Sequence, residues 1–260
     1  MTFKAILLAS AACLMTAASA QAAQVAALVG DNTIAVVDTA AKKTTKTMTV
    51  TGINGALLGI DVRPADGMLY GVAADGSVVT IDPASGKATV KSKLDTMLPA
   101  GVTATVDFNP AADRLRVIGS DCTNLRANVD DGKVTKDGAL KYADSDMHKG
   151  EKSNIVAGAY TNSYKGTKET TLFDIDGTIG ALIKQAPPND GVLNAVGKLG
   201  MKVDKVGFDI SSDGKGGNEA WLMSGGTLYS VDLATGKATE AAKIAGVTGA
   251  VRDIAILPAM

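Results

Sequence analysis

The chain has 260 residues, a formal net charge of −1, 29 glycines and 4% aromatic residues. The length suits one all-β domain, and the nearly neutral charge argues against the basic surface typical of proteins that bind nucleic acid. Frequent glycine together with many short strand-like runs favours a sandwich, a barrel or a propeller.

The first 22 residues have the pattern of a secretory signal. Lys4 precedes an apolar run over residues 5–15, and the small residues Ala18, Ala20 and Ala22 fit the usual cleavage pattern. The run is shorter than the ~20 residues that span a bilayer. We therefore predict a cleaved signal peptide at residues 1–22 and a single domain at residues 23–260. The expected location is periplasmic or extracellular, with no transmembrane segment.

The residue types of common catalytic centres are scarce after cleavage. A lipoprotein signal through Cys13 is disfavoured, because Ser10 stands where such signals usually have Leu. The remaining Cys122 cannot form an internal disulfide, and one cysteine with one histidine does not make a zinc site. His148 lies in a polar stretch, residues 142–154, that is typical of a surface loop. No phosphate-binding or dinucleotide-binding glycine motif is present.

Strand-like segments recur along the chain in two kinds of element. The chain first shows three strands, "QVAALVG", "TIAVVDT" and "KTTKTMTV". An apolar strand carrying Asp then leads through a turn into a second strand, as in "LLGIDVRPADGMLYGV", "TATVDFNPAADRLRVI" and "KVGFDISSDGKGGNEAWLM". A hairpin follows, as in "IDPASGKAT", "VDDGKVT" and "VDLATGKAT". Asp and Gly suit such turns, because Asp accepts backbone N–H groups and Gly adopts positive φ.

The Asp-bearing strands set the repeat length and the topology. We align Asp61, Asp107, Tyr160, Asp209 and Asp253, which are 44 to 53 residues apart. Repeats of ~40–50 residues with four strands each indicate a β-propeller. The last Asp-bearing strand, residues 250–257, has no partners after it, and the three N-terminal strands have no inner strand before them. We therefore predict an all-β, five-bladed propeller closed by pairing of the C-terminal strand with the N-terminal strands.

The aligned acidic residues have two interpretations. As a ring around the central channel they would attract a cation, and calcium suits oxygen-only ligands. Alternatively each carboxylate accepts hydrogen bonds from backbone amides of its own or the next blade, and the regular recurrence favours this structural role. The candidate metal ligands are Asp61, Asp107, Asp209 and Asp253. The wider candidate ligand-binding ring adds Tyr160, Arg114 and Arg116.

Two stretches depart from the regular pattern. Residues 159–200 have a longer outer hairpin with "PPNDG" as its turn, and "DIDG" within them is a weak match to the start of a calcium loop. Alternation places Arg114 and Arg116 on one face of their strand. They could neutralise the carboxylate ring or bind an anionic ligand. We slightly favour a third interpretation, in which they are solvated or form ordinary ion pairs with carboxylates.

Four stretches together resemble a known family. "GIDVRPADGMLYGV", "VDFNPAADRLRVIGSDCTNLRANVDDG", "AYTNS" and "PPNDGVLNAVGKLG" occur in the order seen in the bacterial domain-of-unknown-function family 4394. The resemblance covers residues 26–257. It implies an exported, propeller-like bacterial protein and implies no activity. Relatives more often have Gln in place of the Cys-Thr of "SDCTNLR", which argues against a special role for Cys122.

Two classes of function fit these observations. We favour a non-enzymatic binding or interaction module, expected to be a monomer, whose partner is a small molecule or a protein and not nucleic acid. The alternative is a calcium-assisted hydrolase or lyase that acts on carbohydrate or a lactone through channel carboxylates. The low aromatic content, with Trp221 as the single tryptophan, argues against a sugar site.

Overall fold

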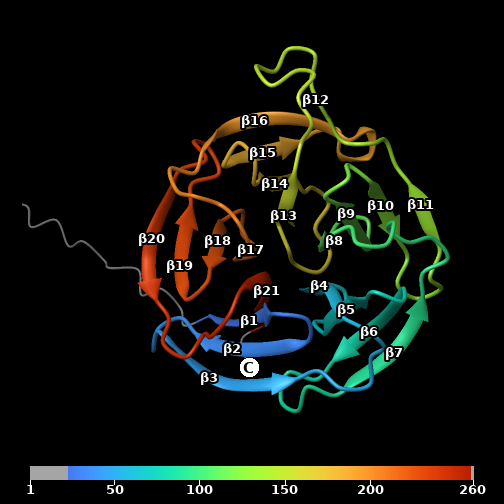
Figure 1. Cartoon of the computed structure of the whole chain (residues 1–260), viewed down its shortest axis with the longest axis vertical. Coiled ribbons are helices and arrows are strands. Elements are labelled where there is room, and N and C mark those ends of the chain that lie inside the picture. The colour runs from blue at the N-terminus through green and yellow to red at the C-terminus, as the bar shows by residue number, and fades with distance from the viewer. Residues whose placement is uncertain (1–22, 259–260) are drawn as a thin grey trace, which may run out of the picture.

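The computed structural model describes residues 23–258, which form strands β1 to β21 and one short 3-10 helix. The strands make five sheets that surround a central axis (Figure 1). The predicted five-bladed β-propeller is therefore confirmed. The predicted signal peptide, residues 1–22, lies outside the described residues. Within residues 23–258, no helix has the length and apolar character needed to cross a membrane.

Blade 1 joins the two ends of the described chain. Its strand order is β21 (Val251–Leu257), β1 (Gln24–Val29), β2 (Thr33–Asp38) and β3 (Lys43–Thr49). Strand β21 runs antiparallel to β1, with Gln24 paired to Leu257 at one end and Val29 paired to Val251 at the other. The closure predicted from the unpartnered strands at both ends is confirmed.

Blades 2, 3 and 5 each contain four consecutive antiparallel strands. Blade 2 contains β4 (Leu57–Val62), β5 (Leu69–Ala73), β6 (Ser77–Ile81) and β7 (Ala88–Lys93). Blade 3 contains β8 (Ala104–Asn109), β9 (Arg114–Gly119), β10 (Asn124–Ala127) and β11 (Val134–Lys136). Blade 5 contains β17 (Gly207–Ser212), β18 (Asn218–Ser224), β19 (Thr227–Val231) and β20 (Ala238–Lys243).

The repeated hairpin turns also pack each blade against the one before it. In the turn between β6 and β7, Asp82 Oδ1 accepts the N–H of Ala84 at 2.8 Å. Gly86 in the same turn has a φ of +76°, and a Cβ there would lie 2.7 Å from the carbonyl oxygen of Thr49 on blade 1. Glycine is therefore required twice at this position, for its backbone conformation and for the close approach of blades.

Blade 4 is the irregular blade. It contains β13 (Ile155–Tyr160), β14 (Leu172–Asp176), β15 (Ala181–Gln185) and β16 (Val192–Lys198), with the 3-10 helix Pro188–Asp190 in the predicted "PPNDG" turn. A fifth strand, β12 (Lys141–Tyr142), pairs with β16 in parallel. The chain next to β12 projects outward from the ring (Figure 1).

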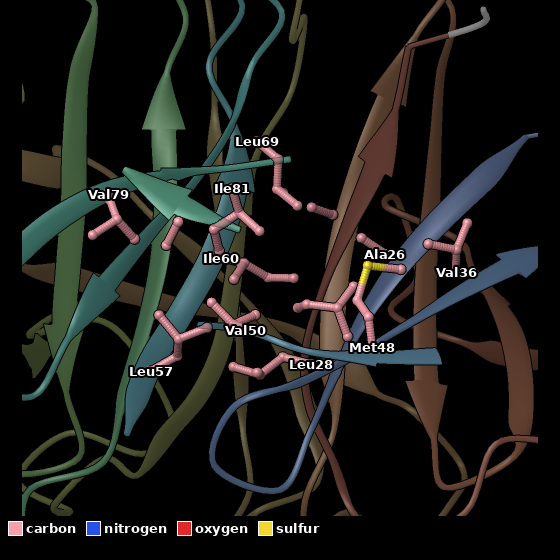
Figure 2. Close-up of a cluster of buried hydrophobic side chains, with 13 residues drawn as sticks. Ala26, Leu28, Val36, Met48, Val50, Leu57, Ile60, Leu69, Val79 and Ile81 are labelled. Carbon is pink, nitrogen blue, oxygen red and sulfur yellow. The ribbon is translucent and has the colours of Figure 1, made fainter. Parts of the chain in front are cut away.

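Apolar side chains fill the space between neighbouring blades. Figure 2 shows the cluster between blades 1 and 2, where Leu28 and Met48 meet Leu57 and Ile60. The inner strands of successive blades, β21, β4, β8, β13 and β17, contact one another around the axis. The polar residues of the inner strands therefore lie on neighbouring strands around the axis.

Candidate functional site: the inner-strand carboxylates and the channel mouth

Aspartates on four inner strands bind the backbone of the next blade. Each carboxylate accepts a main-chain N–H from the following inner strand. The pairs are Asp253 Oδ2 with Ile60 N at 3.0 Å, Asp61 Oδ2 with Phe108 N at 2.6 Å, Asp107 Oδ1 with Tyr160 N at 2.9 Å and Asp209 Oδ2 with Ile256 N at 2.6 Å. These are the bonds that the structural interpretation of the recurring Asp predicts. These bonds explain why a carboxylate is tolerated in an apolar strand, because each carboxylate accepts a hydrogen bond from a buried N–H donor.

The second carboxylate oxygen differs among the four residues. In three of them it accepts the N–H of the next residue, as in Asp61 Oδ1 with Val62 N at 2.6 Å and Asp209 Oδ1 with Ile210 N at 2.6 Å. Within the described part of the chain, Asp107 Oδ2 has no protein hydrogen-bond partner. Asp107 therefore offers the one inner-strand carboxylate oxygen that is not already engaged by the backbone.

Three of the carboxylates converge. One oxygen from each of Asp61, Asp107 and Asp209 lies within 4.8 Å of the others. Two oxygens bound to one calcium ion at 2.3–2.6 Å each stand at most ~5 Å apart, so the spacing fits a cation in contact with all three. Asp253 is not part of this group of three, although it belongs to the same ring of blade-to-blade bonds.

Burial and mutual repulsion change the acidity of the group. The pKa of Asp61 and of Asp107 is raised well above the usual value, first by burial and then by repulsion from neighbouring carboxylates. Burial raises the pKa of Asp209 to about 6, against two backbone hydrogen bonds that lower it. A bound positive charge would compete with these protons, so cation binding would release protons and strengthen as pH rises.

A cavity of about 380 Å³ opens beside the converging carboxylates. Asp61 and Asp209 line it together with Ser163, Tyr164 and Ser211. The channel mouth, as we call this cavity, thus combines negative charge with hydroxyl groups and a phenol ring. Its volume lies within the range of small-molecule sites.

The structure places three predicted ring residues away from the channel mouth. The hydroxyl of Tyr160 accepts a hydrogen bond from Arg116 Nε at 3.1 Å, so the tyrosine side chain faces blade 3. Arg116 is 2% exposed and pairs with Asp137 at 2.6 Å, which is the ordinary ion pair considered for it. Arg114 donates to the carbonyl of Asp113 at 2.8 Å. None of the three lines the channel mouth, and of the predicted aspartates only Asp61 and Asp209 line it, whereas Asp107 and Asp253 do not.

The other candidate residues are also accounted for. His148 Nδ1 lies 2.9 Å from Glu151 in the loop that follows β12, and Cys122 Sγ lies 3.5 Å from Ser153 Oγ. In the "DIDG" stretch, Asp176 accepts the Tyr142 hydroxyl at 2.7 Å and backbone amides, so it supports a turn. These contacts within the protein give none of them a feature that points to catalysis.

Sequence reasoning missed two buried polar features. Arg63, 7% exposed, binds Asp113 with two hydrogen bonds at 2.8 and 2.6 Å and Asp130 at 2.9 Å, joining blades 2 and 3. Asp174, fully buried in blade 4, has no hydrogen-bond partner for either oxygen among the described residues. The sequence does signal the first feature. Arg63 of "RPADG" and Asp113 of "NPAADR" belong to the turns that follow the equivalent inner strands of blades 2 and 3.

Replacing Asp253 tests the role of the blade-to-blade bonds without touching the three converging carboxylates. We expect Asp253→Ala to lower the free energy of unfolding by ~1–3 kcal/mol, because buried N–H groups lose their acceptor. Asp253→Asn should cost less, since it keeps one carbonyl oxygen. Urea denaturation at pH 7 measures both. Equal stability of the Ala variant and the unsubstituted protein would contradict the structural role.

Comparison with known proteins supports the fold and gives no activity. A family model described as "Domain of unknown function (DUF4394)" matches residues 33–255. A Bacteroides thetaiotaomicron protein of unknown function is similar at 17% identity and a TM-score of 0.50, over 91% of this chain and 64% of that one. A Bacteroides caccae protein of unknown function is 12% identical with a TM-score of 0.43, over 85% of this chain and 73% of that one. No curated protein matches significantly.

Proposed function

Since this chain belongs to the DUF4394 family, which is described only as a domain of unknown function, we propose from its site that it is a non-enzymatic binding module. Its channel mouth takes a small ligand that carries a cationic group. The proposal includes export to the periplasm or cell exterior, which the signal-like pattern of residues 1–22 supports.

The observation that carries this proposal is the unengaged oxygen of Asp107 beside two other carboxylates. Among the described residues the only hydrogen bond to the Asp107 carboxylate goes from Tyr160 N to Oδ1, and one oxygen of Asp107 lies within 4.8 Å of oxygens of Asp61 and Asp209. A positive group placed there would relieve the repulsion that raises the pKa of Asp107. The hydroxyls of Ser163 and Ser211 at the channel mouth can hold the remainder of a polar ligand.

Two of the three carboxylates, those of Asp61 and Asp209, are poorly suited to catalysis. A general acid, base or nucleophile needs an oxygen that can approach the reacting atom. Both oxygens of Asp61 and both of Asp209 accept short backbone hydrogen bonds, so moving either would break contacts between or within inner strands. A fixed ring of charge favours binding over chemistry.

A calcium-assisted hydrolase or lyase acting on carbohydrate or a lactone is the second candidate. One observation favours it: the three converging carboxylates offer the donor type that calcium binds, at a spacing that one ion could bridge. In that case the ion, held by Asp61, Asp107 and Asp209, would polarise a substrate oxygen in the channel mouth.

Thermal unfolding with two cations separates the candidates. We expect butylammonium chloride to raise the melting temperature relative to sodium chloride at equal ionic strength, because binding to the folded state stabilises it. The rise should grow between about pH 5 and about pH 8, as protons leave a cluster in which Asp209 titrates near 6. It should vanish in Asp107→Asn and persist in the matched Asp253→Asn variant.

Calcium chloride provides the opposing arm of this experiment. We expect it to change the melting temperature no more than sodium chloride does. A large calcium effect that is lost in Asp107→Asn, with no effect of butylammonium, would overturn the proposal and favour the metal-dependent enzyme. No effect of either cation at any pH would overturn both.

A further inference from the structure

We propose that a groove between blades 1 and 2 is a second binding site, for a small amphipathic anion such as an aliphatic carboxylate. The groove has a volume of about 860 Å³, within the range of small-molecule pockets. The residues that line this groove include the apolar Leu69, Ile81 and Leu257 and the charged Lys46, Lys87 and Asp82. This site lies outside the function proposed above and does not depend on it.

The floor of the groove continues the apolar core between the two blades. Val36, Leu69 and Ile81 belong both to the buried cluster and to the groove lining, and Val36 and Leu69 lie at the edge of that cluster in Figure 2. Leu257 of β21 packs against the same cluster. Met68, which is 47% exposed, completes the apolar lining. Leu69 and Ile81 are themselves only 3% exposed, so the apolar surface that a ligand can reach in the groove belongs to Met68, Leu257 and Pro258.

The rim of the groove carries an excess of positive charge. Lys46 and Lys87 line it, against one carboxylate, Asp82. That carboxylate is engaged by its own turn, accepting Ala84 N at 2.8 Å and Ser85 Oγ at 2.6 Å. Lys46 donates to the carbonyl of Ala84, while Lys87 forms no ion pair among the described residues. An anionic head group near Lys87 would gain a charge-assisted contact.

Apolar floor and cationic rim together define the ligand. An alkyl chain placed against Met68, Leu257 and Pro258 removes apolar surface from water. A carboxylate at the rim then meets Lys87. A cationic head group would instead face two lysines and be repelled. The groove therefore prefers anions, whereas the channel mouth prefers cations. The two cavities share only Gly67, Leu257 and Pro258, which form the wall between them.

The repeated hairpin provides matched control variants for a test. Lys87 and Thr89 of "IDPASGKAT" in blade 2 line the groove, and Lys237 and Thr239 occupy the same places in "VDLATGKAT" of blade 5. We expect decanoate, below its micelle concentration, to bind the purified protein in isothermal titration calorimetry. Lys87→Glu should weaken binding about tenfold or more, and Lys237→Glu should leave it unchanged. Thr89→Trp, which fills the groove, should abolish binding, whereas Thr239→Trp should not.

Decyltrimethylammonium, with the same chain length and opposite charge, tests the role of the rim. It should bind at least about tenfold more weakly than decanoate and should bind better to Lys87→Glu. Equal binding of the two compounds, or equal effects of the blade 2 and blade 5 substitutions, would overturn the proposal. Absence of decanoate binding would do the same. Asp107→Asn should not alter decanoate binding, so the failure of one proposed site is distinguishable from the failure of the other.

Discussion

Deletion of residues 250–258 is expected to prevent folding. The deletion removes β21, the inner strand of blade 1, and leaves the hydrogen-bonding edge of β1 unpaired. It also removes two of the four carboxylate bonds between inner strands, since Asp253 is lost as an acceptor and Ile256 as the donor to Asp209. Exposed strand edges promote aggregation. Circular dichroism and size-exclusion chromatography should show an aggregated or largely unfolded chain.

A rearranged chain provides the control for this deletion. Residues 250–258 can be placed before Ala23 through a short Gly-Ser linker, because Leu257 and Gln24 are paired neighbours in an antiparallel ladder. This chain restores β21 as the first strand of a hairpin, and we expect it to fold. A truncated chain as stable as the full one would show that closure of the ring contributes nothing.

Asp174→Asn is expected to stabilise the protein at neutral and alkaline pH. Burial raises the pKa of Asp174 to about 8, and neither carboxylate oxygen has a hydrogen-bond partner within the described residues. The unfolded chain ionises this group near pH 4, whereas the folded protein keeps it neutral until about pH 8. The stability associated with this group is therefore full below about pH 4 and falls as pH rises to about 8. At ~1.4 kcal/mol per pKa unit, the loss is at most ~6 kcal/mol.

The asparagine removes this ionisation and adds a donor. Gln185 Oε1 also lacks a partner, and the pairing of Asp174 with Ile183 places Gln185 on the same face of blade 4. Urea denaturation should show a higher free energy of unfolding for Asp174→Asn at pH 8 than for the unsubstituted protein, with a smaller difference at pH 5. Asp176→Asn is the matched control and should destabilise, because both oxygens of Asp176 accept hydrogen bonds. An Asp174→Asn protein no more stable at pH 8 would contradict the prediction.

The topology could be predicted from sequence because its causes are local and repeated. Each hairpin turn needs Asp and Gly for reasons of backbone geometry. The motifs "IDPASGKAT" and "VDLATGKAT" therefore predict equivalent pairs of outer strands in two blades. Closure followed from counting strands without partners. The recurring Asp also indicated that each blade has a buried backbone N–H group in need of an acceptor. The structure identifies these groups as the amides of Ile60, Phe108, Tyr160 and Ile256.

The orientation of Tyr160 could not be predicted by aligning the repeats. Alternation has a period of two, so an alignment that is wrong by one residue reverses the direction of a side chain. The pairing of β13 shifts between Ile155 and Ala157, and Tyr160 occupies the amide-donor position that Phe108 fills in blade 3. Its neighbour Ala159 packs in the cluster with Phe208, on the side facing blade 5.

Arg116 and β12 illustrate two further limits. Alternation shows that Arg114 and Arg116 share a face, but both faces of a propeller blade meet another blade. Only the distance from the axis, which depends on strand order, separates a channel residue from one in an interface. Strand β12 has two residues, Lys141 and Tyr142, too few to show any period, and its partner β16 lies about 50 residues further along the chain.

The pairing of the chain ends within blade 1 also determines how the molecule responds to mechanical tension. Gln24 and Leu257 face each other in an antiparallel ladder, so a force that pulls these two residues apart acts on one end of that ladder. Its hydrogen bonds then carry the load in succession rather than together, and β21 peels away from β1. A tether attached at both ends would therefore open the ring at blade 1 under low force, while the other four blades remain under little strain.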